Sequence, residues 1–507
     1  MESFPDEILL VIFDMVAPPI TSLTSPHLHQ DAYYFALLCR VSHRFRRIGT
    51  PLLYRSIERP PNAEEPMCKF LRTVQQVPTL KDHIKYIRLS EPPNFHHYLE
   101  SAPLQEILHS LPLRTIRSLA TQLHLPDPDE ICSRYIRVGD DILLALATFM
   151  APKLEKLVVD FPSYAHYEYS RSEYAPPLIE AICRMALGET LGHVHNFKSL
   201  RVLHINNTGG AGLPITWTLP LLLLPQLRDL SLYSWDEGIT HQVYGHVWTW
   251  PRRTSPIRRL SLIRPSVRPL FISDFIEACE ALTSFECTEP QGRFLEWFSY
   301  ISDALKAHSE SLETLSVTTS WIAHGRNFHL TGNDSWGRLP CIANLANLKN
   351  LRVPFYFFFS NEPIGASIPS ALESLTFDFR TNGRPQDANP LFAGILDACS
   401  HKPLSSLKNI RVFILLRHYK FPLPIDCTKF ITVFKAQGIR LDVMVSCLSG
   451  RVPPGKDTMQ KFEEIFPEHC AIIHNPSTWA PALKASTWAD HRSKEEIQRD
   501  MANGYLM

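Results

Sequence analysis

The hexapeptide Leu-Glu-Thr-Leu-Ser-Val at residues 312–317 is one copy of a pattern that recurs along most of the chain: apolar, two residues, apolar, one residue, apolar. The other copies begin at residues 84, 154, 200, 227, 257, 282, 348, 372 and 407. Nine of the ten second-position residues are charged, although charged residues make up only 20% of the chain, and nine of the ten fifth-position residues are polar. This alternation with a period of two predicts a short strand in each copy, apolar on one face and polar on the other.

Helical segments separate most of the predicted strands. We predict them at residues 142–150, 178–187, 272–281, 294–308, 391–399 and 430–437. A repeated unit of one strand and one helix predicts an α/β solenoid. The alternative is a doubly wound α/β sheet, but its strands would be apolar on both faces, so the alternation favours the solenoid. A gap of 70 residues between the copies at 84 and 154 leaves room for a degenerate unit near Arg114.

The N-terminal segment SFPDEILLVIFDMV, residues 3–16, predicts a first helix. Pro5 suits a first helical turn, and the two acidic residues after it suit the positive end of the helix dipole. One face carries Ile8, Leu9, Ile12, Phe13 and Val16. Leu10, Val11 and Met15 lie off that face, so the helix is apolar nearly all round. Either a partner covers the surplus apolar surface, or later segments of the same chain do.

Residues 32–57 predict two further short helices that meet near Val41 and Ser42, with Ser42 as the N-cap of the second. The segment also carries Arg40, Arg44, Arg46 and Arg47. These arginines form either a stripe for nucleic acid or a solvated helix face. The net charge of +0 favours the solvated face.

The N-terminal residues resemble an F-box. The resemblance rests on Phe4-Pro5-Asp6-Glu7-Ile8-Leu9, Ile12-Phe13, Leu38-Cys39-Arg40-Val41-Ser42, Phe45-Arg46 and Pro51-Leu52-Leu53-Tyr54. It implies a three-helix module that docks on the Skp-type adaptor of an SCF ubiquitin ligase and, through it, on a cullin core. By motif position, the implied adaptor-binding residues are Pro5, Ile8, Leu9, Ile12, Phe13, Leu38, Cys39, Val41 and Phe45. The sequence departs from the family pattern at Phe4, where Leu is usual, and at Phe45, where Trp is common.

The repeat region is similar to an irregular leucine-rich repeat domain of the kind that often follows an F-box. In such a solenoid the outward polar residues of successive strands form one continuous surface. Target-binding residues are therefore predicted at Arg88, His204, Tyr233, Arg259, Glu286, Arg352 and Arg411. Insertions after residues 160, 232 and 318 would lie along one rim of this surface, and the first two are rich in Tyr and Trp.

The predicted domains are a helical module at 1–57, a solenoid at 58–450, and an accessory helix with a flexible tail at 451–507. Equal numbers of basic and acidic residues exclude a whole-chain basic field for nucleic acid or an anionic membrane. Eleven cysteines without a C-x-x-C pair argue for a reducing compartment. The apolar runs are far shorter than the ~20 residues of a membrane helix. We expect a soluble protein of the cytoplasm, the nucleus or both.

Motifs that would indicate catalysis are missing from the sequence. It has no P-loop, no dinucleotide-binding glycine motif, no G-x-S-x-G and no H-E-x-x-H, and its paired histidines lack further ligands at metal spacing. We therefore expect no cofactor, no metal and no enzymatic activity, and a role as substrate-recognition subunit of an SCF-type ligase. The alternatives are an F-box scaffold outside ubiquitin ligation, an interaction solenoid whose helical module packs on its own repeats, and an enzyme with a pocket in an insertion.

Overall fold

The computed structural model is that of a mixed α/β protein with a parallel sheet. It describes residues 4–16, 28–59, 64–90, 111–138, 141–161, 176–207, 213–236, 242–288, 297–318, 341–354, 368–381, 392–397, 406–416, 427–447 and 470–472. The chain forms two compact units, one of Met1–Ile257 with Ala278–Glu280, and one of Arg258–Glu277 with Ala281–Met507. The predicted domain at 58–450 therefore contributes to both units.

The first unit begins with three helices and continues with a helix-rich part of the sheet. Its helices are α1 (Asp6–Val16), α2 (Leu28–Val41), α3 (His43–Leu53), α4 (Glu64–Gln76), α7 (Leu111–Gln122), α8 (Pro128–Val138), α9 (Asp141–Phe149) and α11 (Pro177–Ala186), with 3-10 segments η1 (Pro78–His83) and η2 (Ile215–Leu223). Its main strands are β1 (Ser56–Arg59), β2 (Tyr86–Ser90), β3 (Lys156–Phe161), β4 (Val202–Asn207) and β6 (Asp229–Tyr233). Two small pairs are β5 (Leu213–Pro214) with β7 (Trp235–Asp236), and β8 (Gln242–Val243) with β9 (His246–Val247).

The second unit alternates strands with shorter helical segments. Its strands are β10 (Arg259–Ile263), β11 (Ser284–Thr288), β12 (Thr314–Thr318), β13 (Asn350–Pro354), β14 (Ser374–Thr381), β15 (Asn409–Leu416), β16 (Arg440–Cys447) and β17 (Cys470–Ile472). Its helices are α12 (Pro269–Ala278), α13 (Trp297–Lys306), η4 (Ile342–Asn344) and α16 (Cys427–Ala436).

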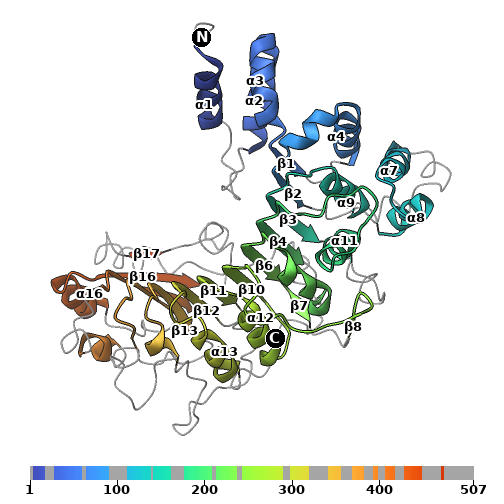
Figure 1. Ribbon diagram of the computed structural model, residues 1–507. Helices are drawn as coiled ribbons and strands as arrows, with labels where there is room; N and C mark the ends of the chain where they lie inside the picture. The colour runs from blue at the N-terminus through green and yellow to red at the C-terminus, as the bar shows by residue number, and fades with distance from the viewer. Residues whose placement is uncertain are drawn as a thin grey trace, which may run out of the picture. The chain divides into compact units, whose positions relative to one another are not determined.

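Within each unit the strands of the main sheet follow one another in chain order (Figure 1). The order is β1-β2-β3-β4-β6 in the first unit and β10 through β17 in the second. Each of these main-sheet pairings within a unit is parallel, whereas the small β8–β9 pair is antiparallel. All ten hexapeptide copies coincide with a strand that begins at the third residue of the copy, which confirms the strand prediction.

The apolar positions of the hexapeptides form the core beneath the sheet. In β12, for example, Leu315 and Val317 are fully buried, while Thr314 and Ser316 between them are partly exposed. Residues 142–149 of α9 are all buried as well. In the first unit, α9 and α11 lie along the same side of the sheet (Figure 1). The period-two alternation thus separates a face packed on helices from a polar face, which we call the strand face.

Most predicted helices are confirmed, with boundaries shifted by a few residues: 142–150 is α9, 178–187 is α11, 272–281 is α12, 294–308 is α13 and 430–437 is α16. Of the segment 391–399, residues 392–397 are helical. The degenerate unit near Arg114 was a wrong prediction. Arg114 lies in α7, and β2 pairs directly with β3, so no strand intervenes. The predicted accessory helix in 451–507 lies outside the described residues, and that region contributes β17 to the sheet.

The charged second-position residues stand at the start of each strand and contact their counterparts in the next repeat. The backbone oxygen of Lys85 accepts hydrogen bonds from the amides of Glu155 and Lys156, at 2.8 and 3.0 Å. The Lys85 ammonium also pairs with Glu155 at 2.8 Å. Lys349 pairs in the same way with Glu313 at 3.2 Å, and Lys408 with Glu373 at 2.5 Å. Pairs of opposite charge therefore join neighbouring repeats at these three places, and part of the charge bias at the second position serves such contacts.

Candidate interaction surfaces

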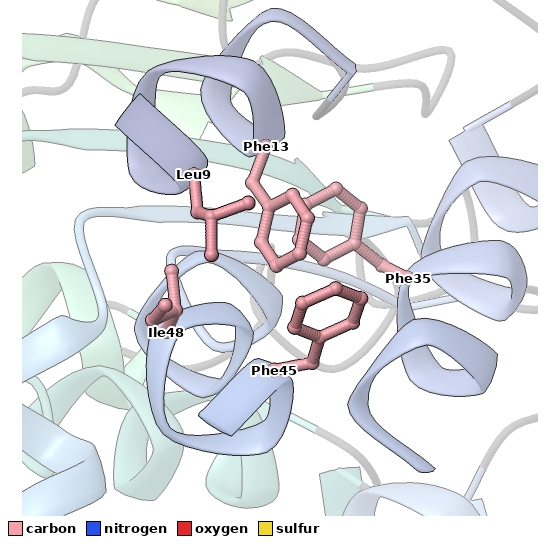
Figure 2. Packing of buried hydrophobic residues seen from close by; sticks show 5 residues of the cluster. All are labelled: Leu9, Phe13, Phe35, Phe45 and Ile48. Carbon is pink, nitrogen blue, oxygen red and sulfur yellow. The ribbon is translucent and has the colours of Figure 1, made fainter. Parts of the chain in front are cut away.

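A small aromatic core holds the first three helices together. Leu9 and Phe13 of α1 face Phe35 of α2 and Phe45 and Ile48 of α3, and all five side chains are buried (Figure 2). The Phe13 ring meets the rings of Phe35 and Phe45 edge-on, with centroids 5.8 and 5.4 Å apart. Edge-to-face packing of this kind adds to the stabilisation from burial alone.

Polar contacts fix the helices around this core. Ser42 caps α3 as predicted, because its hydroxyl accepts a hydrogen bond from the Phe45 amide at 3.1 Å. Asp6, at the start of α1, pairs with Arg44 at 2.7 Å and also with Arg47. Two of the four arginines in this segment therefore serve contacts within the module, an arrangement that favours neither a nucleic-acid stripe nor a simply solvated face.

A second apolar face of α1 is exposed. Ile8, Val11, Ile12 and Met15 have exposed fractions of 45, 57, 37 and 81%. Their spacing of i, i+3, i+4 and i+7 places them on one side of the helix, and we call them the α1 stripe. Leu37 and Val41 of α2 are also exposed. Exposed apolar side chains that gather on one helix face are typical of a protein–protein interface.

The structure divides the predicted adaptor-binding residues into three groups. Pro5, Ile8, Ile12 and Val41 are exposed, and Leu38 and Cys39 are half-buried. Leu9, Phe13 and Phe45 lie in the core of the module, where they support the surface and do not form it. The prediction did not include Val11 and Met15, because α1 is apolar nearly all round and spacing alone does not select its exposed face.

The strand face of the first unit carries three of the predicted target-binding residues. Arg88 lies 3.9 Å from the carboxylate of Asp160 on the next strand. The His204 ring lies 3.6 Å from the carboxylate of Asp229, again on the next strand. Tyr233 is buried, with only 8% of its surface exposed. Of the three, Arg88 and His204 therefore offer accessible polar groups.

The strand face of the second unit carries the other four. The strand registers align the fifth-position residues in one row across the sheet: Ser261, Glu286, Ser316, Arg352, Thr376, Arg411 and Asp442. Arg411 lies 3.9 Å from Asp442, and Arg352 pairs with Asp378 at 3.0 Å. Arg259, the third residue of its hexapeptide copy and the first of β10, is exposed. The structure thus brings Glu286, Arg352 and Arg411 into one row, with Arg259 beside it.

Glu286 is a half-buried acid of this row. Hydroxyl groups of Ser261 and Thr288 donate to its two carboxylate oxygens, at 3.0 and 3.2 Å. Burial raises the pKa of Glu286, although the Ser261 and Thr288 hydrogen bonds and the charge of Arg352 act in the opposite direction. Glu286 is accordingly committed to contacts within the sheet.

Four basic residues on the strand face share one arrangement. Arg88, His204, Arg352 and Arg411 each stand beside an aspartate of the following strand. Opposite charges on neighbouring strands stabilise their pairing. The strand face therefore carries internally paired charges, and not a concentrated basic surface.

The insertion after residue 232 packs on the helical side of the first unit. Trp235 is buried, and the Tyr244 hydroxyl donates to the Trp217 backbone oxygen at 2.9 Å. His246 contacts Glu189 at 3.1 Å. These residues attach the β8–β9 hairpin to the region of α11 and η2, away from the strand face. The other two predicted insertions lie almost wholly outside the described residues.

The described residues contain no group of three or more His, Cys, Asp or Glu side chains arranged to hold a metal ion. His195 is engaged on both ring nitrogens, with the Thr148 oxygen at 3.0 Å and the Phe197 amide at 3.2 Å. The cysteines whose side chains are described form no disulfide. None of the helices in the described ranges has both the length and the apolar character needed to cross a bilayer.

Comparison of the chain with protein-family models, with curated proteins and with solved structures finds no match.

Proposed function

We propose that this chain is the substrate-recognition subunit of an SCF-type ubiquitin ligase of the cytoplasm or nucleus. In this proposal the three-helix module is an F-box that docks on a Skp-type adaptor, and the adaptor connects it to a cullin core. The parallel sheet with its helices is a leucine-rich-repeat-like solenoid that holds a target protein. The observation that carries the proposal is the α1 stripe, which stays exposed although the opposite side of the same helix is buried.

The energetics of the α1 stripe favour a protein partner. Burial of a large aliphatic side chain stabilises a complex by about 1.5–3 kcal/mol relative to exposure. Ile8, Val11, Ile12 and Met15 therefore provide a substantial driving force for association. The alternative, in which later segments of the chain cover this helix, predicts low exposure for these residues, whereas the described residues of the first unit leave 37 to 81% of each exposed.

The order of the strands supports the solenoid. A doubly wound sheet reverses its strand order at a switch point. In both units the strands instead continue in chain order. The polar third- and fifth-position residues then form rows across many strands, a surface suited to an extended contact with a folded target.

The role of this chain would be proximity and not catalysis. A receptor that holds its target beside the ligase core raises the effective concentration of target lysines near activated ubiquitin. The proposal needs no cofactor or metal in this chain.

Capture of a recombinant Skp-type adaptor by the full-length chain tests the proposal. Ile8→Asp with Ile12→Asp should abolish capture, because two charges would enter the apolar interface. Leu9→Asp is unsuitable, since Leu9 is completely buried and its replacement would unfold the module. Val77→Asp is the matched control, because the exposed fraction of Val77, 44%, is close to the 45% of Ile8, but Val77 lies outside the module.

The result that would overturn the proposal is failure of the intact chain to bind the adaptor. Equal binding by the wild type and the Ile8→Asp, Ile12→Asp variant would exclude the α1 stripe as the interface. Adaptor binding without recruitment of a cullin would favour the alternative role as a scaffold outside ubiquitin ligation.

A further inference from the structure

The three-helix module joins the sheet through only two residues. α3 ends at Leu53 and β1 begins at Ser56, so the connection consists of Tyr54 and Arg55. The Tyr54 amide donates to the Thr50 oxygen at 3.1 Å, and the Tyr54 ring stacks on Phe70 of α4 with centroids 6.4 Å apart. The predicted boundary at residue 57 falls inside β1, so no linker separates the module from the sheet.

The backbone of Arg55 belongs to both structures. Its amide donates to the oxygen of Leu52 in α3 at 3.2 Å. Its oxygen accepts hydrogen bonds from the amides of Lys85 and Tyr86 at the start of β2, both at 3.0 Å. Because Ser56 is in register with Tyr86, Arg55 occupies the second position of the first repeat, where charged residues join neighbouring strands elsewhere in the chain.

Lys85, Lys349 and Lys408 pair through their side chains with second-position residues of a neighbouring repeat. The Arg55 side chain has a different partner. Its Nη1 donates to Oδ1 of Asp14 on α1 at 2.5 Å. The Arg55 side chain is 33% exposed and that of Asp14 is 55% exposed. One residue therefore contacts α3, the first strand pair and α1, which carries the exposed stripe.

The position of Asp14 argues that this contact orients α1. Asp14 lies in the last turn of α1, where the negative end of the helix dipole disfavours an acidic residue. Its carboxylate gains a counterion from Arg55. At the other end of α1, Asp6 pairs with Arg44 and Arg47. The stripe from Ile8 to Met15 thus lies on a helix that ion pairs hold near both ends.

We propose that Arg55 is a positioning residue of the ligase: together with Asp14 it fixes the direction of the α1 stripe relative to the strand face of the first unit. An adaptor bound to the stripe and a target bound to the strand face then have a defined relative orientation. This inference rests on the proposed function, but its structural part is measurable without the ligase.

Amide hydrogen exchange on the full-length chain tests the structural part. Arg55→Ala should speed exchange in the last turn of α1 by about threefold, as expected for one partly exposed ion pair. The matched control is Lys85→Ala, which removes the equivalent ion pair of the next repeat and should leave α1 unchanged. The charge-swapped variant, Asp14→Arg with Arg55→Asp, should restore slow hydrogen exchange in α1. Arg55→Asp alone should give the fastest hydrogen exchange of these variants.

Self-ubiquitylation tests the functional part without a known target. In a ligase reconstituted with a recombinant Skp-type adaptor and cullin core, Arg55→Ala should keep adaptor affinity within about twofold. Modification at the lysines used by the wild type should slow by at least about threefold, because misplacement of reacting groups reduces rate. The charge-swapped variant, Asp14→Arg with Arg55→Asp, should recover both the rate of modification and the pattern of modified lysines. The control Lys85→Ala should keep the rate and the pattern of the wild type.

The outcomes separate this inference from the proposed function. Unchanged α1 exchange in Arg55→Ala, or an unchanged rate and pattern of modification, would overturn the positioning role even if the adaptor binds. Failure of the wild type to bind the adaptor would overturn the proposed function, and with it the ligase role of Arg55, whereas the exchange measurement would still decide whether Arg55 holds α1.

Discussion

Arg352 donates two hydrogen bonds to the carboxylate of Asp378 on the neighbouring strand, from Nε to Oδ2 at 3.1 Å and from Nη2 to Oδ1 at 3.0 Å. The two side chains are 19% and 5% exposed. The guanidinium also lies over the ring of Phe413, 5.2 Å from its centroid. A bidentate pair of this kind is strong and geometrically specific. The Arg352 guanidinium is therefore committed to contacts within the sheet.

Loss of the Asp378 carboxylate should destabilise the second unit. Asp378→Ala leaves the mostly buried charge of Arg352 without its partner, and we expect a loss of about 2 kcal/mol in the free energy of unfolding. Urea denaturation of the full-length chain measures it. Asp303→Ala, which removes a solvent-exposed pair with Lys306, should change stability little. Equal losses in the two variants would contradict the prediction.

Replacement of Glu286 should change how stability depends on pH. Burial raises the pKa of Glu286, so above its ordinary value of 4.5 the folded chain binds this proton more tightly than the unfolded chain. The stability contributed by this site therefore falls as the pH rises through that window. Glu286→Gln should be more stable than the wild type at pH 7, and the difference should shrink at pH 4. Thermal unfolding at both values measures this, with Glu310→Gln on the surface as control.

Gly49 marks the close crossing of α2 and α3. A Cβ atom at this position would lie 2.7 Å from Sγ of Cys39 and 3.9 Å from the Phe13 ring. Gly49→Ala should therefore cost about 1–2 kcal/mol of unfolding free energy despite the better helix propensity of alanine. The double variant Cys39→Ala with Gly49→Ala should recover most of the loss, because the clashing sulfur is gone. A Gly49→Ala variant more stable than the wild type would contradict the prediction and show that α2 and α3 can move apart at little cost.

The ion pair between two second-position residues, Glu373 and Lys408, predicts a salt-dependent effect. Glu373 pairs with Lys408, and the hydrogen bond and charge of Lys408 lower the pKa of Glu373, with a smaller contribution from Lys349. Glu373→Lys would place three cations in a row, so Tm should fall in low salt. The difference from the wild type should shrink in 1 M NaCl, at which the Debye length is about 3 Å. A salt-independent change would point to another cause.

The strands were predictable because each hexapeptide needs only local information, the alternation of apolar and polar residues. Three strands of the main sheet, β1, β16 and β17, lie outside the ten copies, and the departures of the first two have specific causes. In β16 the first apolar position is taken by Gly438, and in β1 the sixth is taken by Arg59. The gap between the copies at residues 84 and 154 could not be interpreted from the hexapeptide pattern alone. A degenerate repeat and an inserted helix such as α7 both leave a stretch without that pattern.

The buried and exposed faces of α1 were not predictable from spacing. Ile8 and Leu9 are adjacent and equally apolar, and only the aromatic residues of α2 and α3 decide that Leu9 is inward. The polar residues carry the information that the apolar spacing lacks. Asp6 stands three residues before Leu9 and seven before Phe13, on the side of the helix that meets Arg44 and Arg47.

The place of β1 at the end of the strand order has a practical consequence. Of the described strands only β2 pairs with it, so its other edge offers unpaired backbone groups. Such an edge is a template for aggregation unless neighbouring structure covers it. A chain shortened to begin at residue 58 would cut β1 in two and expose β2 as a new edge. Truncation at this point should yield an insoluble product, whereas a start before α1 keeps the end of the sheet intact.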